Sequence, residues 1–258
     1  MPSVPLVPLM SRPVQIIAHR GASHDYPENT LGAVQLAFDQ EADACEIDVQ
    51  FTRDRRLAVM HDDDTCRTAG VRKHIAASDW KDLSDLEVAQ WGKWRQRGFS
   101  QRIPLLEDVI AMLPKGKQLF IEIKAGAQML IELKRVLIEA DRHGTFHLIS
   151  FDLETMRLAK RSMPDIFAHW IVSPRWARKR SPSVNEMIRS ALEAGLDGLD
   201  LRSTFPINAE FVHAIHSAGL KICTWTVDDP TVARAEIDAG VDGITTNRPM
   251  WLRKQLGL

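Results

Sequence analysis

The sequence predicts a closed (β/α)8 barrel, or TIM barrel, with a small inserted subdomain after the second strand. Short apolar runs alternate with amphipathic helical patterns, and we count eight such pairs. The connections between most pairs are short, and barrels of this kind reach 258 residues as a single domain. Strand and helix repeated in this way predict a parallel barrel with its helices outside.

Each expected strand is a short run rich in apolar residues. The strands cover residues 14–18, 44–50, 118–124, 147–151, 166–172, 196–201, 221–227 and 242–246. Helical patterns lie between them, among others at residues 30–40, 127–144, 153–163, 185–195, 208–219 and 230–240. Several of these helices end in Gly, which is favoured at a helix C-cap.

One region departs from the alternation. The segment LAVMHDDD predicts an extra strand after the second one, and residues 65–103 are tryptophan-bearing and weakly periodic. We expect an insertion at 65–103 in a barrel of residues 14–258. Its apolar side chains could face a ligand, but such a stripe more often packs into a small core against the barrel rim. They are Trp80, Leu83, Leu86, Trp91 and Trp94.

Charge and composition exclude several classes of partner. Lys and Arg number 33 and Asp and Glu 34, so the overall field favours neither nucleic acid nor an anionic membrane. No apolar run approaches the roughly 18 residues that span a bilayer. The proline-rich residues 1–13 predict an extended tail. Three widely spaced cysteines fit reduced thiols, so we expect a soluble, cytoplasmic protein whose oligomeric state the sequence leaves open.

Acidic side chains alternate within two of the expected strands. Glu46 and Asp48 flank Ile47, so both carboxylates face one side of the second strand. The next parallel strand repeats this spacing with Glu122 and Lys124. Three carboxylates from neighbouring strands suit a hard divalent cation, Mg²⁺ or Ca²⁺, better than zinc.

Each of these pairs taken alone is more often a half-exposed or ion-paired feature than a metal site. Together they lie within or at the carboxyl ends of the first strands, the face where such barrels carry their active sites. The residues that gather there are His19, Arg20, Glu46, Asp48, His61, Glu122 and Lys124. Two other features are interpreted as structural and not as functional sites. His213 and His216 lie on an outer helix with no third metal ligand evident, and the basic loop at 173–183 is expected to be solvated.

The order and spacing of these motifs resemble the glycerophosphodiester phosphodiesterase family. His-Arg-Gly at 19–21 is followed by Pro-Glu-Asn-Thr at 27–30, Glu-x-Asp at 46–48, His-Asp at 61–62 and Glu-Ile-Lys at 122–124. The segments LKICTWTVDDP and GVDGITTNRP complete the pattern, which covers residues 14 to 249. The family's usual insertion between the second and third barrel strands matches residues 65–103.

The resemblance implies a metal-dependent phosphodiesterase that hydrolyses glycerophosphodiesters to glycerol 3-phosphate and an alcohol. It implies roles residue by residue: His19 and His61 are catalytic, Arg20 and Lys124 bind the phosphate, Trp225 lies near the substrate, and Glu46, Asp48 and Glu122 bind the metal. One position departs from the family, since Asn247 stands where an aspartate is expected. We expect this change to affect a contact at the rim and not the catalytic set.

Phosphodiester chemistry accounts for this residue set. Arg20, Lys124 and a cation can offset negative charge on the phosphate, and two histidines can serve as general acid and general base. The sequence does not indicate which histidine has which role. Two alternatives stay open: a lysophospholipase-D-like hydrolase with an apolar entrance, and a non-catalytic barrel that binds phosphorylated ligands.

Overall fold

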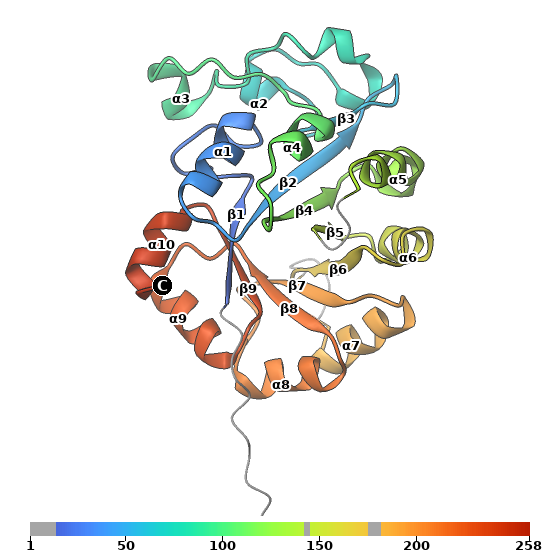
Figure 1. Ribbon diagram of the computed structural model, residues 1–258, viewed down its shortest axis with the longest axis vertical. Coiled ribbons are helices and arrows are strands. Elements are labelled where there is room, and N and C mark those ends of the chain that lie inside the picture. The colour runs from blue at the N-terminus through green and yellow to red at the C-terminus, as the bar shows by residue number, and fades with distance from the viewer. Residues whose placement is uncertain (1–13, 142–144, 175–181) are drawn as a thin grey trace, which may run out of the picture.

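The computed structural model describes residues 14–141, 145–174 and 182–258 (Figure 1). The expected tail at 1–13 and residues 175–181 of the basic loop lie outside this part of the chain. No helix in the described ranges is long and apolar enough to cross a membrane.

The parallel strands form the predicted barrel. They are β1 (Gln15–His19), β2 (Ala44–Phe51), β4 (Gln118–Ile123), β5 (Phe146–Ser150), β6 (Phe167–Val172), β7 (Gly198–Arg202), β8 (Lys221–Trp225) and β9 (Gly243–Thr246). Each pairs in parallel with its neighbours, and β1 pairs with both β2 and β9, which closes the sheet. All carboxyl ends of these strands therefore meet at one face.

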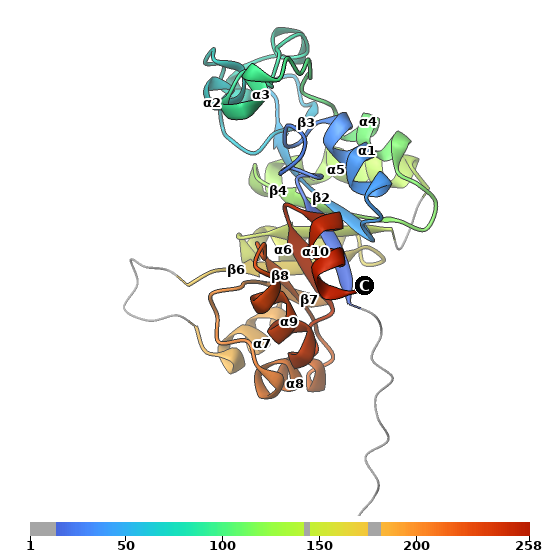
Figure 2. The same ribbon diagram turned by 90° about the vertical axis from the view of Figure 1, so that its left-hand side faces the viewer.

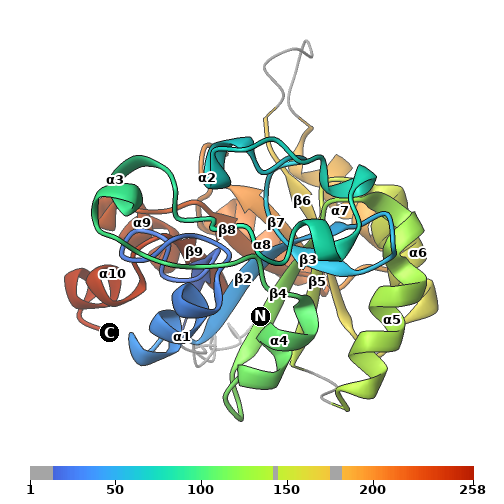
Figure 3. The same ribbon diagram turned by 90° about the horizontal axis from the view of Figure 1, so that it is seen from above.

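Helices surround the strands, as Figure 3 shows from above. They are α1 (Leu31–Asp39), α4 (Leu106–Met112), α5 (Leu130–Glu139), α6 (Leu153–Ser162), α7 (Val184–Glu193), α8 (Ala209–Ser217), α9 (Pro230–Ala239) and α10 (Pro249–Leu256). A 3-10 turn, η3 (Gly126–Met129), precedes α5. Side-chain caps explain several of the starting points: Thr30, Asp152 and Ser183 each accept a hydrogen bond from a backbone N–H of the first turn.

The strands bury a different layer of side chains on each face. One large core lies between the strands and the helices, and it includes Ile47, Val49 and Ile121. A smaller cluster fills the barrel interior with Ile17, Phe120 and other residues. Because strand side chains alternate, the acidic residues next to Ile47 on β2 must point to the interior.

The insertion stands above the barrel at the carboxyl end of β2 (Figure 2). The expected extra strand, β3 (Leu57–Val59), precedes it and is antiparallel to β2. The insertion itself contains α2 (Cys66–Ala69), η1 (Ile75–Ala77), η2 (Trp80–Asp82) and α3 (Gly92–Gln96). Most of the predicted apolar stripe packs inside it. Leu83 and Trp94 are buried, and Trp80 and Leu86 pack against the same small core as Leu83. Trp91 differs, since it lines a cavity.

Candidate active site

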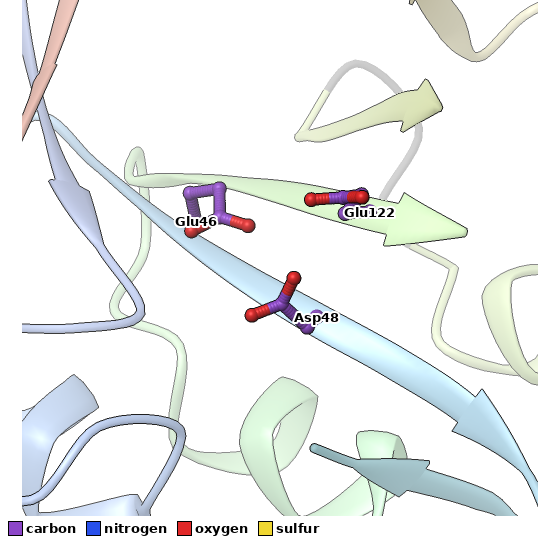
Figure 4. Close-up of side chains that lie close together, drawn as sticks. All are labelled: Glu46, Asp48 and Glu122. Carbon is purple, nitrogen blue, oxygen red and sulfur yellow. The ribbon is translucent and has the colours of Figure 1, made fainter. Parts of the chain in front are cut away.

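Three carboxylates converge inside the barrel from two adjacent strands. Glu46 and Asp48 project from β2 and Glu122 from β4, where Asp48 and Glu122 lie opposite each other in the parallel register. Each offers an oxygen that lies within 4.8 Å of those of the other two. Figure 4 shows the three side chains grouped between the strands.

The cluster is buried and carries unbalanced negative charge. Burial, followed by the charges of Asp48 and Glu122, raises the pKa of Glu46 well above its usual range. The pKa of Glu122 rises to about 7, first through burial and then through Asp48. The Lys124 ammonium lies 3.0 Å from Glu122 Oε1 and 3.5 Å from Asp48 Oδ1. Asp48 Oδ1 is buried and has no hydrogen-bond partner among the described residues. An orphaned buried oxygen in an all-oxygen donor set fits a hard divalent cation.

Asn29 and Arg20 keep Asp48 in place. Asn29 Nδ2 donates to Asp48 Oδ2 at 2.8 Å, and Asp48 N donates to Asn29 Oδ1 at 3.2 Å. Arg20 Nε lies 3.2 Å from the same Oδ2. Burial alone would raise the pKa of Asp48, but Arg20 and then Lys124 hold it at about 2. The role of Asn29 was not predicted, although its Pro-Glu-Asn-Thr motif was recognised.

Arg20 reaches several acidic groups because the chain turns sharply after β1. Its φ is 53°, in the left-handed region, and Gly21 follows at φ 80°. A Cβ at Gly21 would lie 2.5 Å from the carbonyl carbon of Ala33, so only glycine fits there. The turn lets Arg20 N donate to Glu46 Oε2 at 2.9 Å while its guanidinium bonds Glu28 at 3.0 Å.

His19 ends β1 beside this cluster. Its Nδ1 lies 2.7 Å from Asn247 Oδ1. Burial, followed by the charge of Arg20, lowers the pKa of His19. The departure from the family at Asn247 was expected to touch only a rim contact, and that expectation is wrong because Asn247 bonds a predicted catalytic residue directly. Sequence reasoning missed this because the two residues are 228 positions apart.

His61 follows β3 and has a different partner. Its Nδ1 lies 2.7 Å from Asp62 Oδ1, and Asp62 Oδ2 accepts from Arg67 Nε at 2.6 Å. Arg67 also donates to Glu28, the carboxylate that Arg20 bonds. A chain of charged groups thus connects His61 to Arg20. Asp62 was not predicted as a site residue, and its only signal was its place next to His61.

These groups border a cavity of about 90 Å³ at the carboxyl ends of the strands. All predicted site residues except Asp48 line it: His19, Arg20, Glu46, His61, Glu122, Lys124 and Trp225. Ile149, Phe151 and Ile171 form an apolar wall. Asp200 also lines it and was missed; burial and then Glu122 raise its pKa to about 8.

A second cavity of about 290 Å³ adjoins the first and shares His19 and Arg20 with it. Trp91 and Lys93 of the insertion and Asp228 and Asn247 of the barrel also line it. The insertion therefore borders the site on one side. His213 and His216 do not line either cavity; His216 bonds Asp242 and His213 bonds Ser217.

Comparison with known proteins finds relatives of this chain in sequence and in structure. The model of the glycerophosphoryl diester phosphodiesterase family matches residues 19–250. The Bacillus subtilis protein YhdW is 31% identical over 242 residues, covering 93% of this chain and 96% of the relative. A glycerophosphodiester phosphodiesterase of Caldanaerobacter subterraneus is 29% identical over 247 residues, covering 91% and 94%. A phosphodiesterase of Oleispira antarctica, solved in complex with the product sn-glycerol-3-phosphate, aligns with a TM-score of 0.80 and 25% identity over 95% and 97%.

Proposed function

The chain belongs to the glycerophosphoryl diester phosphodiesterase family and is an enzyme of that class. From this premise we propose that it uses a divalent cation and two histidines to hydrolyse glycerophosphodiesters to glycerol 3-phosphate and an alcohol. The observation that carries the proposal is the buried carboxylate cluster, which adjoins two histidines, an arginine and a lysine around one cavity. The product bound by the Oleispira antarctica relative supports this substrate class.

Glu46, Asp48 and Glu122 would hold the cation, Mg²⁺ or Ca²⁺. When bound, it supplies positive charge that offsets the negative charge on the phosphate oxygens. Arg20 and Lys124 line the same cavity and add two fixed cationic groups for binding and orienting the phosphate. Trp225 lines the same cavity and would lie near the bound substrate.

His19 and His61 would move protons. One accepts the proton of the attacking oxygen as the new P–O bond forms, and the other donates a proton to the departing alkoxide as the old P–O bond breaks. The glycerol hydroxyl next to the phosphoester is a suitable nucleophile, which would give a cyclic phosphate that water then opens. A substrate without this hydroxyl should react slowly, whereas equal rates would favour direct attack by water.

Metal removal tests this function. Purified protein should lose turnover on exhaustive chelation and recover it with Mg²⁺, Ca²⁺ or Mn²⁺, measured as release of glycerol 3-phosphate from a panel of glycerophosphodiesters. Glu46→Gln and Glu122→Gln should bind the metal weakly and turn over slowly. Full activity of both variants after metal removal would refute the metal requirement.

The apolar wall favours a second substrate class. Ile149, Ile171 and Phe151 line the cavity, and Phe151 is 44% exposed at its edge. A lysophospholipid could place its acyl chain against such a surface, as the lysophospholipase-D-like alternative requires. Lysophospholipids in the same panel decide this point, since turnover of the glycerophosphodiesters alone would exclude the alternative. Membership of an enzyme family argues against a barrel that only binds ligands.

A further inference from the structure

Asn247 connects His19 to Asp228, a carboxylate that has no role in the proposed function. Asn247 Nδ2 donates to Asp228 Oδ2 at 2.5 Å, while Asn247 Oδ1 accepts from Ser23 Oγ at 2.8 Å and lies 2.7 Å from His19 Nδ1. Asp228 is itself held in place, because its Oδ1 accepts from Asn247 N and from Thr246 Oγ1, both at 2.8 Å.

These bonds determine which way the Asn247 amide points. An ionised carboxylate only accepts hydrogen bonds, so the amide nitrogen must face Asp228 and the amide oxygen must face His19. An amide oxygen also only accepts, so His19 Nδ1 must carry the proton. In the neutral ring the lone pair then lies on Nε2. That nitrogen has no hydrogen-bond partner within residues 14–141, 145–174 and 182–258 and is the one left for a ligand in the cavity.

We propose that Asn247 and Asp228 act as a pair of positioning residues that hold His19 in the tautomer able to accept a proton, which assigns His19 as the general base. The inference rests on the proposed function, because it takes His19 to be a proton-transfer residue. His61 then serves the departing oxygen. The pair also accounts for asparagine at position 247. Asp228 fixes the amide so that its oxygen faces His19 Nδ1, as a carboxylate oxygen of an aspartate at 247 would do by itself.

The amide has an electrostatic consequence as well. Arg20, Asp48 and Glu28 have the largest charge effects on His19. Glu46 lies opposite His19 in the β1–β2 register, and Glu122 and Lys124 line the same cavity. Asp228 adds a further negative charge, but Asn247 separates it from the imidazole. An adjacent carboxylate favours the protonated imidazolium, so a neutral amide next to His19 favours the neutral form that a base requires.

Exchanging the two side chains tests the pair without changing the net charge. In Asp228→Asn, the group at 228 can donate as well as accept, so the Asn247 amide is free to turn its nitrogen toward His19. We expect kcat to fall at least about 10-fold, with KM and metal affinity unchanged, because the wrong tautomer of a catalytic histidine is costly. In the double variant N247D/D228N, the carboxylate at position 247 again accepts from Nδ1, and kcat should recover to within a few-fold of the original.

The pH profile separates positioning from a merely structural role. Only neutral His19 can accept a proton, so the acid limb of kcat/KM follows its ionisation. The double variant moves a carboxylate beside the imidazole, and its acid limb should shift to higher pH by about one unit or more. Asp238→Asn, an exposed change on α9, is the charge control and should leave both kcat and the acid limb unaltered.

A measurement on the unaltered protein tests the tautomer directly. The ¹⁵N chemical shifts of His19 should show a protonated Nδ1 and an unprotonated Nε2 above the acid limb, and the reverse assignment overturns the proposal even if no variant folds. It is also overturned if Asp228→Asn keeps the original kcat, or if N247D/D228N neither recovers kcat nor shifts the limb. His19→Ala separates the two levels of inference: normal turnover would refute the proposed function, whereas an inactive His19→Ala with an ineffective exchange would refute only the positioning pair.

Discussion

The two ends of the barrel interior both contain a pair of histidines, but the pairs have different surroundings. At the carboxyl end, His19 and His61 each bond a separate partner and border the cavity. Toward the amino ends of β5 and β6, His147 Nδ1 lies 3.0 Å from His169 Nε2, and the His147 ring stacks between Phe120 and Phe167. Both of these histidines are buried.

The comparison teaches that burial of an ionisable group does not by itself mark a site. Burial, followed by the charge of His169, lowers the pKa of His147 well below its usual range, and burial lowers the pKa of His169 to about 4. Neither lines either cavity described above. What distinguishes the carboxyl end is the combination of open space with charged partners of both signs.

The largest expected effect comes from Glu46→Gln. This change should lower activity and raise stability at the carboxyl end, so it distinguishes the two roles of the cluster. Loss of a carboxylate from the metal cluster should reduce kcat by about 10³-fold or more, several kcal/mol of barrier. The metal-free variant should nevertheless unfold at a higher temperature than the metal-free original at pH 7. A carboxyl with a raised folded-state pKa loses stability as pH rises above its ordinary value, and the neutral amide removes that loss. A lower melting temperature in the presence of chelator would contradict this account of the cluster.

The next largest effect compares the histidines themselves. His19→Ala and His61→Ala should each lower kcat by about 10² to 10⁴-fold with metal affinity nearly unchanged. His169→Gln is the matched change at the amino end and should keep kcat within about threefold, because His169 contacts neither cavity. Isothermal titration with the metal, beside steady-state kinetics, distinguishes lost proton transfer from lost metal binding.

The amino-end pair should instead control stability toward acid. Unfolded histidine binds protons below pH 6.5, whereas folded His169 does so only near pH 4. Stability is therefore fully present above about pH 6.5 and is lost as pH falls toward 4, by on the order of 3 kcal/mol from His169 alone. Denaturant unfolding between pH 4 and 8 should show this slope, and His169→Gln should flatten it. Equal slopes would mean that other groups dominate.

The smallest effect extends the comparison to the insertion. Trp91 borders the second cavity, so Trp91→Ala should change the ratio of kcat/KM between two headgroups by about 10-fold, or about 1.4 kcal/mol. Val71→Ala, an exposed change in the same insertion, should leave the ratio as it was. An unaltered preference in Trp91→Ala would contradict a role of this side chain in selecting the headgroup. Competition assays with paired substrates measure the ratio directly.

The barrel could be predicted because its periodicity is local. Every parallel strand lies close to an expected run. The expected strand at 196–201 begins two residues later, at Gly198–Arg202, although Asp197 N already donates to Ala168 O and Asp197 O accepts from Lys221 N. The carboxylates could be predicted because alternation along β2 places Glu46 and Asp48 on one face.

The remaining site residues could not be predicted from local patterns. Asn29 is seen to be a hydrogen-bond partner of Asp48 only once the turn after β1 folds back onto β2. The bonds of Asn247 to Asp228 and His19 join β9 to the loop after β8 and to β1, and no period in the sequence encodes them. Asp200 alternates inward on β7, but nothing in LDGLDL distinguishes it from a surface carboxylate.

The left-handed backbone at Arg20 has a consequence for how this protein can be evolved in the laboratory. Glycine adopts φ 53° without strain, and arginine does so at a cost. The same conformation brings the Arg20 guanidinium to Asp48 and Glu28. A library at position 20 selected for thermal stability should therefore enrich glycine, whereas one selected for turnover should keep arginine. Position 20 is thus a site where heat resistance and catalytic fitness would be selected in opposite directions.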